Sequence, residues 1–332
     1  MITHNARPFI RGKVCLITGG GGSIGSELAR QAAYLGAAKV VIADIYENGA
    51  YDIAREIGDG VEVEIASVRD YDRMNHIMTQ YKPDIIFHAA AHKHVPFMEQ
   101  NPEEAVKNNI KGTDIMTALA EKHKADCFVL ISTDKAVEPI SIMGASKRVC
   151  EMMVYEKAMK SNHTKFTAVR FGNVMGSNGS VIPLFKRQIE RGCVTVTDKN
   201  AERYFMTISQ AAELVLCSAE IAEGGEIFVL DMGEEVRILD LALKLIRDAG
   251  KIPYKDVKIE FTGLRQGDKL NEKLFYDFEK RQKTKYDKIV RISGSGSEKL
   301  HKTVQMLYHM ADRADRDGIR DLIIKFTRGE LG

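Results

Sequence analysis

Residues 13–25, KVCLITGGGGSIG, decide the fold of this chain. The run before the glycines is apolar and rich in β-branched residues, which predicts a buried strand. Gly19, Gly22 and Gly25 follow it directly, and the apolar spacing beyond them, as far as Leu35, predicts a helix. Glycines at this spacing allow a tight turn and a close approach of the backbone to a pyrophosphate at the helix N-terminus. The stretch therefore predicts the start of a dinucleotide-binding domain; the alternative is a flexible surface loop.

The second predicted strand, Lys39–Ala43, leads into Asp44. A carboxylate at this position accepts hydrogen bonds from the adenosine ribose hydroxyls and repels a 2′-phosphate. The next residues, 45–48, read IYEN and contain no arginine or lysine that could bind that phosphate. The pattern favours NAD over NADP. Asp44 could also cap a helix predicted over 47–57, and this alternative is compatible with the same position.

Short apolar runs and helical stretches continue to alternate through the first half of the chain. The runs are almost continuously apolar, which is typical of parallel strands covered on both faces. The alternation predicts an α/β fold with a Rossmann-type, doubly wound parallel sheet. The predicted strands are 13–18, 39–43, 61–66, 84–88, 126–132 and 165–170, and the predicted helices between them include 23–35, 70–81 and 103–123.

The pattern loosens after residue 175. We expect residues 1–175 to form the NAD-binding domain, with a strand and helix returning to it from 205–232. Residues 176–332 should form mainly a smaller C-terminal substrate-binding lobe and the C-terminal helices. The predicted elements there are strands at 194–197, 226–230 and 258–261, helices at 209–221 and 238–249, a polar loop at 263–269, and charged amphipathic helical sequence over about 298–329.

The composition excludes several classes of protein. A net charge of +2 in 332 residues gives no electrostatic reason to bind nucleic acid or an anionic membrane. The five cysteines are widely spaced without a C-x-x-C pair, which argues against a disulfide framework or a zinc site and fits a reducing cytoplasm. No stretch approaches the ~20 apolar residues of a membrane span. We see no constellation of metal ligands, and the basic stretch Lys280–Lys288 is typical of a solvated face.

Two short segments carry the candidate chemistry. The first reads STDK and ends in Asp134 and Lys135; the second reads MGASK, from Met143 to Lys147. A short-chain dehydrogenase normally has Tyr-x-x-x-Lys in the second segment, where the tyrosine removes a hydroxyl proton. The thioether of Met143 cannot take or give a proton. The pattern indicates a reaction other than simple alcohol oxidation.

A 4,6-dehydration of a hexose would use an adjacent carboxyl and amine. Oxidation at C4 by hydride transfer to NAD acidifies the C5 proton; a base then takes this proton while an acid protonates the departing 6-hydroxyl, and the hydride returns to C6. Asp134 and Lys135 follow a predicted strand, at the edge where ligand sites gather in doubly wound sheets. They could supply the acid and the base if burial and mutual coupling adjust their pKa values. The alternative is an exposed salt-bridging pair.

On these residues the chain resembles the UDP-N-acetylglucosamine 4,6-dehydratases of the extended short-chain dehydrogenase/reductase family. Methionine in place of tyrosine, together with Thr-Asp-Lys, is similar to the subgroup that retains the C5 configuration. The matching segments are TGGGGSIG (18–25), FHAAAHKHVPFME (87–99), NNIKGT (108–113), STDKAVEPISIMGASKR (132–148), VRFGNVMGSNGSVIPLF (169–185), RYFMT (203–207), FVLDMGEEVRILDLA (228–242) and FTGLRQGDKLNEKL (261–274).

The resemblance implies roles for individual residues. Lys135 would be the C5 base and Asp134 the acid, with Thr133 near the sugar O4, Met143 in the tyrosine position and Lys147 on the nicotinamide ribose. The implied NAD-binding residues are Gly19, Gly22, Ser23, Ile24, Gly25, Asp44, Val68, Ala89, Ala90, Ala91 and Lys147. The implied substrate-binding residues are Lys93, Asn109, Asn173, Val181, Arg203, Arg265 and Asp268, with Glu272 near the uridine ribose.

The resemblance also implies an activity and a setting. The expected reaction converts UDP-N-acetylglucosamine to UDP-2-acetamido-2,6-dideoxy-α-D-xylo-hexos-4-ulose, for surface polysaccharide or glycoprotein glycans. The expected protein is a soluble, cytoplasmic short form that makes a homodimer or larger homo-oligomer. The alternatives are a C5-inverting dehydratase, a UDP-N-acetylhexosamine 4-epimerase and a non-catalytic NAD-binding scaffold. Asp134, a water, or Thr133 relaying to water could accept the 4-hydroxyl proton.

Overall fold

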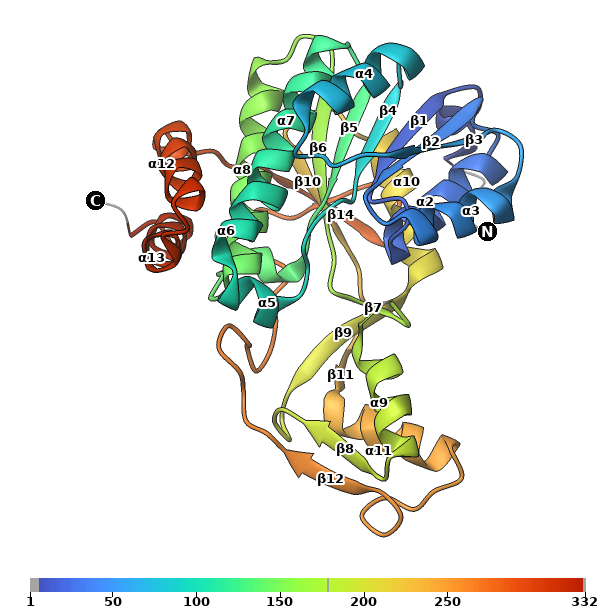
Figure 1. The fold of residues 1–332 in the computed structure, drawn as a ribbon, viewed down its shortest axis with the longest axis vertical. Helices are drawn as coiled ribbons and strands as arrows, with labels where there is room; N and C mark the ends of the chain where they lie inside the picture. Colours follow the sequence, from blue (N-terminus) through green and yellow to red (C-terminus); the bar gives the residue numbers. More distant parts are fainter. Residues whose placement is uncertain (1–5, 178, 331–332) are drawn as a thin grey trace.

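A nine-stranded sheet organises the computed structural model, which describes residues 6–177 and 179–330 (Figure 1). Asn178, in the quoted segment 169–185, lies outside the described residues. From β3 to β10 every neighbouring pair is parallel, and β14 and β13 close one edge antiparallel. In spatial order the strands are β3 (Val61–Ile65), β2 (Lys39–Asp44), β1 (Val14–Thr18), β4 (Ile85–His88), β5 (Cys127–Ile131), β6 (Lys165–Arg170), β10 (Glu226–Leu230), β14 (Ile289–Ser293) and β13 (Gln282–Lys283).

The strand order confirms the predicted doubly wound sheet. The chain runs outward from β1 to β3, then returns to pair β4 on the other side of β1. The order therefore reverses between β1 and β4, which is where such sheets open a crevice for ligands. The edge strands β13 and β14 are an addition, because the sequence analysis assigns no strand to 282–293.

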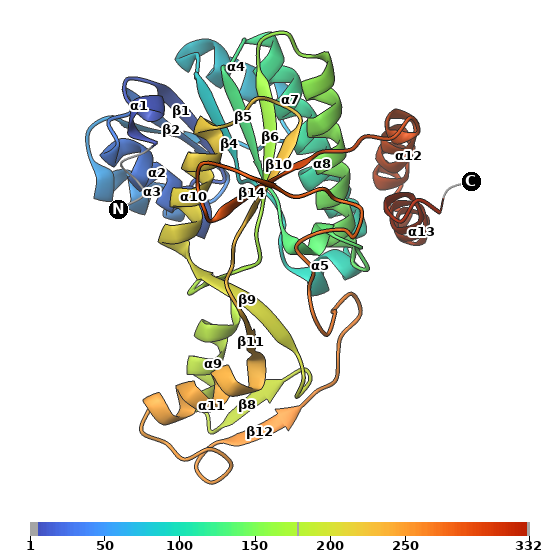
Figure 2. The same cartoon turned by 180° about the vertical axis from the view of Figure 1, so that it is seen from behind.

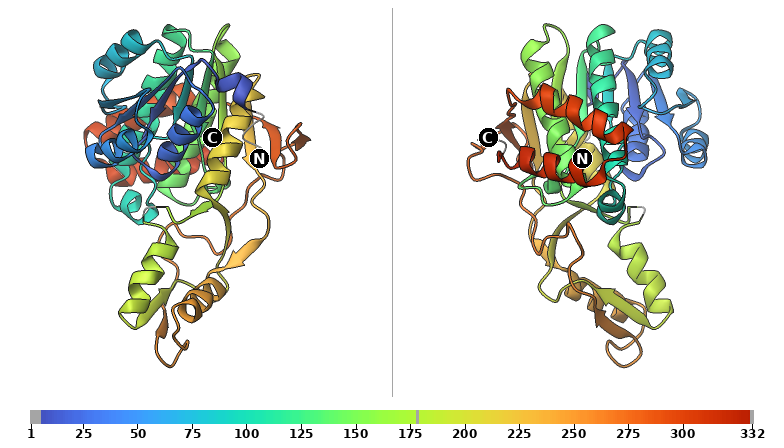
Figure 3. Two further views of the ribbon diagram at one scale, coloured as in Figure 1. Left: turned by 90° about the vertical axis from the view of Figure 1, so that its right-hand side faces the viewer. Right: turned by 60° about the vertical axis from the view of Figure 1, so that its left-hand side comes forward.

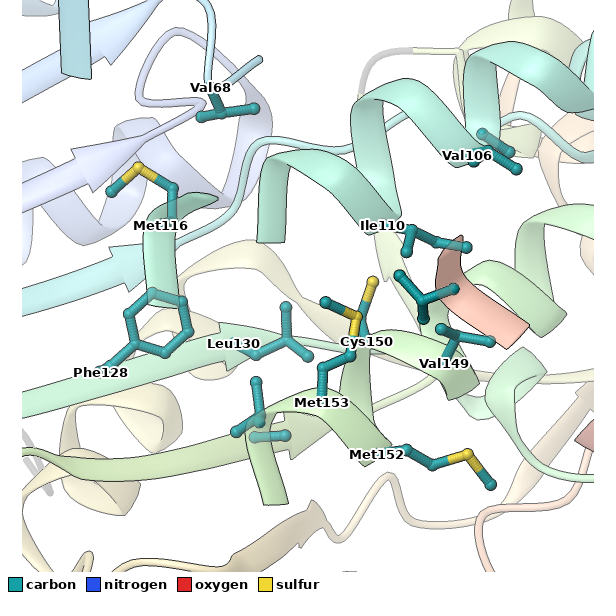
Figure 4. Close-up of a cluster of buried hydrophobic side chains, with 14 of the residues drawn as sticks. Val68, Val106, Ile110, Met116, Phe128, Leu130, Val149, Cys150, Met152 and Met153 are labelled. Carbon is teal, nitrogen blue, oxygen red and sulfur yellow. The ribbon is translucent and has the colours of Figure 1, made fainter. Parts of the chain in front are cut away.

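Helices cover both faces of the sheet (Figures 1 and 2). One face carries α4 (Tyr71–Tyr81), α7 (Lys111–Lys122) and α8 (Ile142–Lys160), and the other carries α2 (Ser23–Tyr34), α3 (Glu47–Ile57) and α10 (Ile208–Glu220); α1 (Arg7–Ile10) packs beside the second group. Figure 4 shows the first interface, where Phe128 and Leu130 on β5 meet Met116 on α7 and Val149 and Met153 on α8. Burial of one such side chain stabilises the fold by about 1.5–3 kcal/mol.

The predicted helix over 103–123 is interrupted. The chain passes α5 (Val95–Gln100) and α6 (Pro102–Glu104), makes a π-helical turn over Ala105–Ile110, and only then becomes α7. A π turn places one more residue in each hydrogen-bonded ring than an α turn does. Asn108 and Asn109 lie in this turn and are buried.

A smaller lobe lies beyond the carboxyl ends of the strands (Figure 1). Its three-stranded sheet and its strand pair pack against two helices around a separate apolar core. Phe185, Val194, Ile246 and Val257 are members of that core. The elements of the lobe are β7 (Asn173–Met175), α9 (Val181–Glu190), β8 (Cys193–Val196), β9 (Glu202–Thr207), β11 (Glu235–Arg237), α11 (Ile238–Asp248) and β12 (Lys258–Phe261).

The charged amphipathic segment predicted over about 298–329 forms two helices, α12 (Leu300–Asp312) and α13 (Arg316–Thr327). Ala314 has a left-handed backbone with φ 54°, and the Asp315 carboxylate accepts the Gly318 N–H at 3.0 Å to start the second helix. The two helices pack on α6, α8 and the π turn (Figure 3). Across the described part of the chain, helices that combine the length and the apolarity of a membrane span are absent.

Arg170, the last residue of β6, joins three parts of the molecule from a completely buried position. Its Nε and Nη2 donate to the Glu151 carboxylate on α8 at 3.1 and 2.9 Å. Its Nη1 donates to Glu279 Oε2 and to the Leu274 carbonyl, each at 3.0 Å. A buried guanidinium requires such partners, since an unpaired charge in the interior is very costly.

We expect Arg170→Met to lower the free energy of unfolding by about 3–5 kcal/mol, because two buried carboxylates each lose a charged partner and only Glu151 keeps another among the described residues, Arg148. Arg30→Met is the matched control: Arg30 pairs with Glu56 at the surface with 2.7 Å between Nε and Oε1, and its loss should cost less than about 1 kcal/mol. Urea denaturation followed by circular dichroism measures both changes. Similar losses in the two variants would contradict the importance of the buried network.

Candidate active site

A hollow of about 230 Å³ opens where the strand order reverses, between the ends of β1 and β4. Ser23, Ile24 and Gly25 begin α2 beside it. The walls bring together most of the residues predicted to bind the dinucleotide: Gly19, Gly22, Asp44, Val68, Ala89, Ala90 and Ala91.

The glycine-rich turn lies directly against the backbone that follows β4. Gly19 has φ 71°, and a Cβ added to it would lie 2.7 Å from the Ala90 backbone nitrogen. Any side chain there would force the two loops apart. Gly22 is the N-cap of α2 and provides no side chain for the first-turn N–H groups. The N-terminus of α2 is therefore able to bind an anion in the hollow.

Asp44 joins the glycine-rich turn to the start of α3 through hydrogen bonds. Its Oδ2 accepts the Gly21 N–H and its Oδ1 accepts the Tyr46 N–H, both at 2.8 Å. Tyr46, not Asp44, is the N-cap of α3, so the capping alternative is wrong. Each carboxylate oxygen can accept a further hydrogen bond, which leaves Asp44 able to receive ribose hydroxyls.

A chain of buried hydrogen bonds starts behind the hollow. Thr18 Oγ1 lies 2.8 Å from His88 Nδ1, and His88 Nε2 lies 3.2 Å from Thr113 Oγ1. The Thr113 hydroxyl donates to the Asn109 carbonyl at 2.6 Å, so it must accept from His88. His88 is therefore a neutral ring protonated on Nε2. Burial, with the Lys147 charge adding to it, lowers the pKa of His88 to about 3.

Asn109 continues this chain of hydrogen bonds into α8. Its Nδ2 donates to the His92 carbonyl at 3.1 Å and to Ser146 Oγ at 3.0 Å, and its Oδ1 accepts the His92 N–H at 2.8 Å. The π turn brings this amide inward. The amide thus ties the segment after β4 to α8, and direct contact of Asn109 with substrate stays a prediction.

Thr133, Asp134 and Lys135 lie where β5 ends. Asp134 is completely buried, and its Oδ1 accepts from Thr133 Oγ1 at 2.9 Å and from Lys135 Nζ at 3.0 Å. Its Oδ2 is buried and has no hydrogen-bond partner among the described residues. The alternative of an exposed surface pair does not describe this geometry.

The charges around Lys135 decide its protonation. Its side chain is 20% exposed, and its Nζ lies 3.4 Å from Asn173 Oδ1 and 3.9 Å from Glu272 Oε1. Burial alone would lower the pKa of Lys135, but the charges of Asp134 and Glu272 outweigh it and raise the pKa above its usual value. Lys135 is an ammonium group in the free protein.

The second candidate segment, residues 143–147, lies near the start of α8. Ser141 caps the helix by accepting the Gly144 N–H at 3.1 Å. A Cβ on Gly144 would lie 2.2 Å from the Lys135 carbonyl oxygen, so glycine allows the helix to pack directly on residues 133–137, the candidate catalytic turn. Met143 and Lys147 are both buried, and burial lowers the pKa of Lys147.

The predicted substrate residues are distributed between the two domains. Lys93 is exposed after β4, and Val181 begins α9. Arg203 donates to the carbonyls of Lys269 and Leu270 at 2.7 and 2.6 Å, and so holds the polar loop.

Arg265 and Asp268 form an ion pair within that loop. The pair joins Arg265 Nε to Asp268 Oδ2 at 3.0 Å, and the Arg265 side chain is 61% exposed. This exposed guanidinium is available to a phosphate oxygen.

Glu272 makes a contact that the sequence did not predict, and its expected place near a uridine ribose stays a prediction. The structure places its carboxylate beside Lys135 because the segment around it is fastened to the catalytic turn. Lys269 Nζ donates to the Val137 carbonyl at 2.7 Å, and the Tyr276 hydroxyl donates to the Ala136 carbonyl at 3.0 Å. This long-range contact has no local sequence pattern.

Residues 6–177 and 179–330 contain no group of three or more histidine, cysteine, aspartate or glutamate side chains placed to hold a metal ion.

Comparisons with known proteins agree with this geometry. Residues 15–294 match the family described as "Polysaccharide biosynthesis protein". The capsular polysaccharide biosynthesis protein CapD of Staphylococcus aureus is 49% identical over 286 residues, covering 84% of this chain and 48% of CapD, so the chain spans about half the length of that relative. The UDP-glucose 4-epimerase of Rickettsia conorii is 34% identical over 275 residues, 79% of this chain and 77% of the epimerase. Among solved structures, Pen from Bacillus thuringiensis is 35% identical with a TM-score of 0.80, over 86% of this chain and 90% of Pen.

The buried His88 makes folding sensitive to acid. Between pH 6.5 and about 3 the unfolded chain binds a proton at this ring that the folded chain excludes. Stability should therefore fall as the pH falls, by up to about 1.4 kcal/mol per pH unit from this group. The variant His88→Gln should show a shallower slope of unfolding free energy between pH 6 and 4.5, measured by urea denaturation. The same slope in both proteins would contradict a neutral buried His88.

Proposed function

This chain belongs to the polysaccharide biosynthesis protein family, and from that membership and the Asp134–Lys135 pair we propose that it is a UDP-N-acetylglucosamine 4,6-dehydratase. The product would be UDP-2-acetamido-2,6-dideoxy-α-D-xylo-hexos-4-ulose with C5 retained, for surface polysaccharide or glycoprotein glycans. The observation that carries the proposal is a buried carboxylate 3.0 Å from an ammonium group, beside a helix that has Met143 where a dehydrogenase has tyrosine. We place the enzyme in the cytoplasm as a homodimer or larger homo-oligomer.

The residues around the hollow fit NAD. The close approach at Gly19 and the first turn of α2 suit a pyrophosphate, and Asp44 suits the adenosine ribose. The small side chains after β4 leave room for the nicotinamide half, and Lys147 would bind its ribose. NAD bound there would accept a hydride from C4 of the sugar and return it to C6.

The acid and base steps fall to Asp134 and Lys135. Lys135 takes the C5 proton while Asp134 gives a proton to the departing 6-hydroxyl, so the pair holds the same number of protons before and after elimination. Elimination starts from a neutral amine on Lys135 and a carboxylic acid on Asp134. The ion pair reaches this form when one proton moves from Lys135 Nζ to Asp134 Oδ1, which lie 3.0 Å apart. Exclusion of water by the sugar favours that shift, because a low dielectric disfavours separated charges.

The same residues account for the remaining proton transfers and for the configuration at C5. Release of one proton by the 4-hydroxyl balances the proton consumed when water leaves. Thr133 Oγ1 donates to Asp134 Oδ1 at 2.9 Å and would relay the proton of the 4-hydroxyl to Asp134. One lysine that removes and returns the C5 proton on the same face keeps the configuration at C5.

A 4-epimerase is the second candidate, since the Rickettsia conorii relative carries that name at 34% identity. Epimerisation needs oxidation and reduction at C4 but no acid for the 6-hydroxyl. The buried Asp134–Lys135 pair has no task in that reaction, and Met143 lacks the proton of a phenol.

Incubation of the protein with UDP-N-acetylglucosamine and NAD tests the proposal. We expect a product lighter by one water in the mass spectrum, without net NADH, and NMR should find the C5 configuration retained. A product that is only UDP-N-acetylgalactosamine would instead establish the epimerase. An inverted C5 would establish the inverting dehydratase, and tight NAD binding without turnover of any UDP-hexose would favour the scaffold.

Replacement of Lys135 should separate removal of the C5 proton from the other steps of the proposed reaction. We expect Lys135→Ala to lose exchange of the C5 proton with solvent deuterium, because no amine remains to take it. Lys273→Ala is the control, since Lys273 pairs with Glu138 at the surface and is 51% exposed. NMR of the recovered sugar in deuterium oxide measures the exchange. Undiminished exchange in Lys135→Ala would remove this residue from the role of base.

A further inference from the structure

We propose that Glu272 is a positioning residue that acts through Lys135: it holds the amine in place and sets how strongly Lys135 binds its proton. The part of this inference that concerns turnover rests on the proposed function. The part that concerns Lys135 itself rests only on the contacts of the two side chains.

The Glu272 carboxylate is buried and faces two lysines. Its side chain is 3% exposed, with Oε1 3.9 Å from Lys135 Nζ and Oε2 3.5 Å from Lys269 Nζ. The Oε2 atom is buried and has no hydrogen-bond partner among the described residues. A carboxylate held in this way, without its own hydrogen bonds, acts on its neighbours mainly through its charge.

The position of Glu272 is fixed from both sides. Before it, Lys269 is bonded to the carbonyl of Val137; after it, Tyr276 is bonded to the carbonyl of Ala136. Further along, Glu279 joins the buried Arg170. Two anchors therefore hold the segment on the catalytic turn and a third holds it on β6, so the approach of Glu272 to Lys135 is a consequence of the fold.

The balance of charge around Lys135 gives the direction of the effect. Asp134 and Glu272 are its negative neighbours; Arg203 opposes them, and Lys269 partly neutralises Glu272. A carboxylate within about 4–6 Å of an amine raises the pKa of that amine by roughly 1–3 units. Loss of the Glu272 charge should therefore make Lys135 release its proton at lower pH.

The same charge would act during the reaction. Once the bound sugar has shifted the pair to its neutral amine and acid form, Lys135 becomes an ammonium group as it takes the C5 proton, and this positive charge develops opposite Glu272. A fixed carboxylate at that position stabilises the transition state of elimination more than the neutral amine before it. Glu272 thus reduces the cost of forming the ammonium ion without touching the sugar.

Glu272→Gln tests the inference, since it removes the charge and keeps the shape. The control is Glu138→Gln. It removes an exposed carboxylate that pairs with Lys273, the residue directly after Glu272. The enzyme is labelled with ¹³C on the lysine carbon next to Nζ, and the signal of Lys135 is assigned by its absence from Lys135→Arg. We expect the titration midpoint of Lys135 to fall by at least about one pH unit in Glu272→Gln and to stay in place in Glu138→Gln.

Activity gives the second readout. With UDP-N-acetylglucosamine, kcat of Glu272→Gln should fall at least about tenfold with little change in KM, and the alkaline limb of its pH profile should move to lower pH with the Lys135 midpoint. Glu272→Asp keeps the charge and should restore part of both effects. It also keeps the test decisive if the glutamine variant does not fold.

The two hypotheses fail in different ways. Wild-type enzyme that turns over no UDP-hexose would overturn the proposed function, while a lowered Lys135 midpoint in folded Glu272→Gln would still support the coupling. Folded Glu272→Gln with an unmoved Lys135 midpoint would overturn the coupling, whatever its activity, and leave Glu272 only a structural residue.

Discussion

The buried ion pair between Arg170 and Glu151 is the constraint on which the catalytic end of the sheet depends. Arg170 closes β6, and Glu151 lies on α8, so the pair locks that strand to the active helix. Glu151 also accepts from the Ser132 hydroxyl at 2.7 Å, immediately before the catalytic turn. The same guanidinium also bonds Glu279. These contacts therefore fix the catalytic turn, α8 and the segment around residue 279 relative to one another. Small errors in this pairing would be transmitted directly to Asp134 and Lys135.

The two halves of the site are joined through buried polar groups. His88 stands between Thr18 at the glycine-rich turn and Thr113 on α7, and the chain of bonds continues through Asn109 to Ser146 on α8. Satisfied polar groups of this kind make the packing more specific than apolar contacts alone, since each has one arrangement in which all its bonds form. The hollow and the catalytic turn are thus joined by one hydrogen-bonded network, and β7 and β9 lead from the large sheet into the smaller lobe.

The sequence predicts what is local. The apolar runs and the glycine spacing give the parallel strands and the turn at Gly19, because these patterns depend on neighbours in the chain. The π turn at Asn109 has the same local signature as an ordinary helix, and its inward bulge is decided by partners far along the chain. The approach of Glu272 to Lys135 was not predicted for a similar reason, since it follows from hydrogen bonds to the catalytic turn far along the chain. Arg170 did leave a signal, because a lone arginine at the end of an apolar strand requires a buried partner.

Two lysines of the site, Lys135 and Lys147, differ in the direction of their pKa shifts because their surroundings differ. Burial dominates at Lys147 and lowers its pKa, whereas two carboxylates dominate at Lys135 and raise its pKa. A base that is already protonated can act only if its proton first moves to a neighbour, and Asp134 is that neighbour at 3.0 Å. The transfer creates the neutral amine and the carboxylic acid together. In the proposed dehydration the acid and the base would therefore be two states of one shared proton, and a tyrosine at position 143 would not be required to supply either.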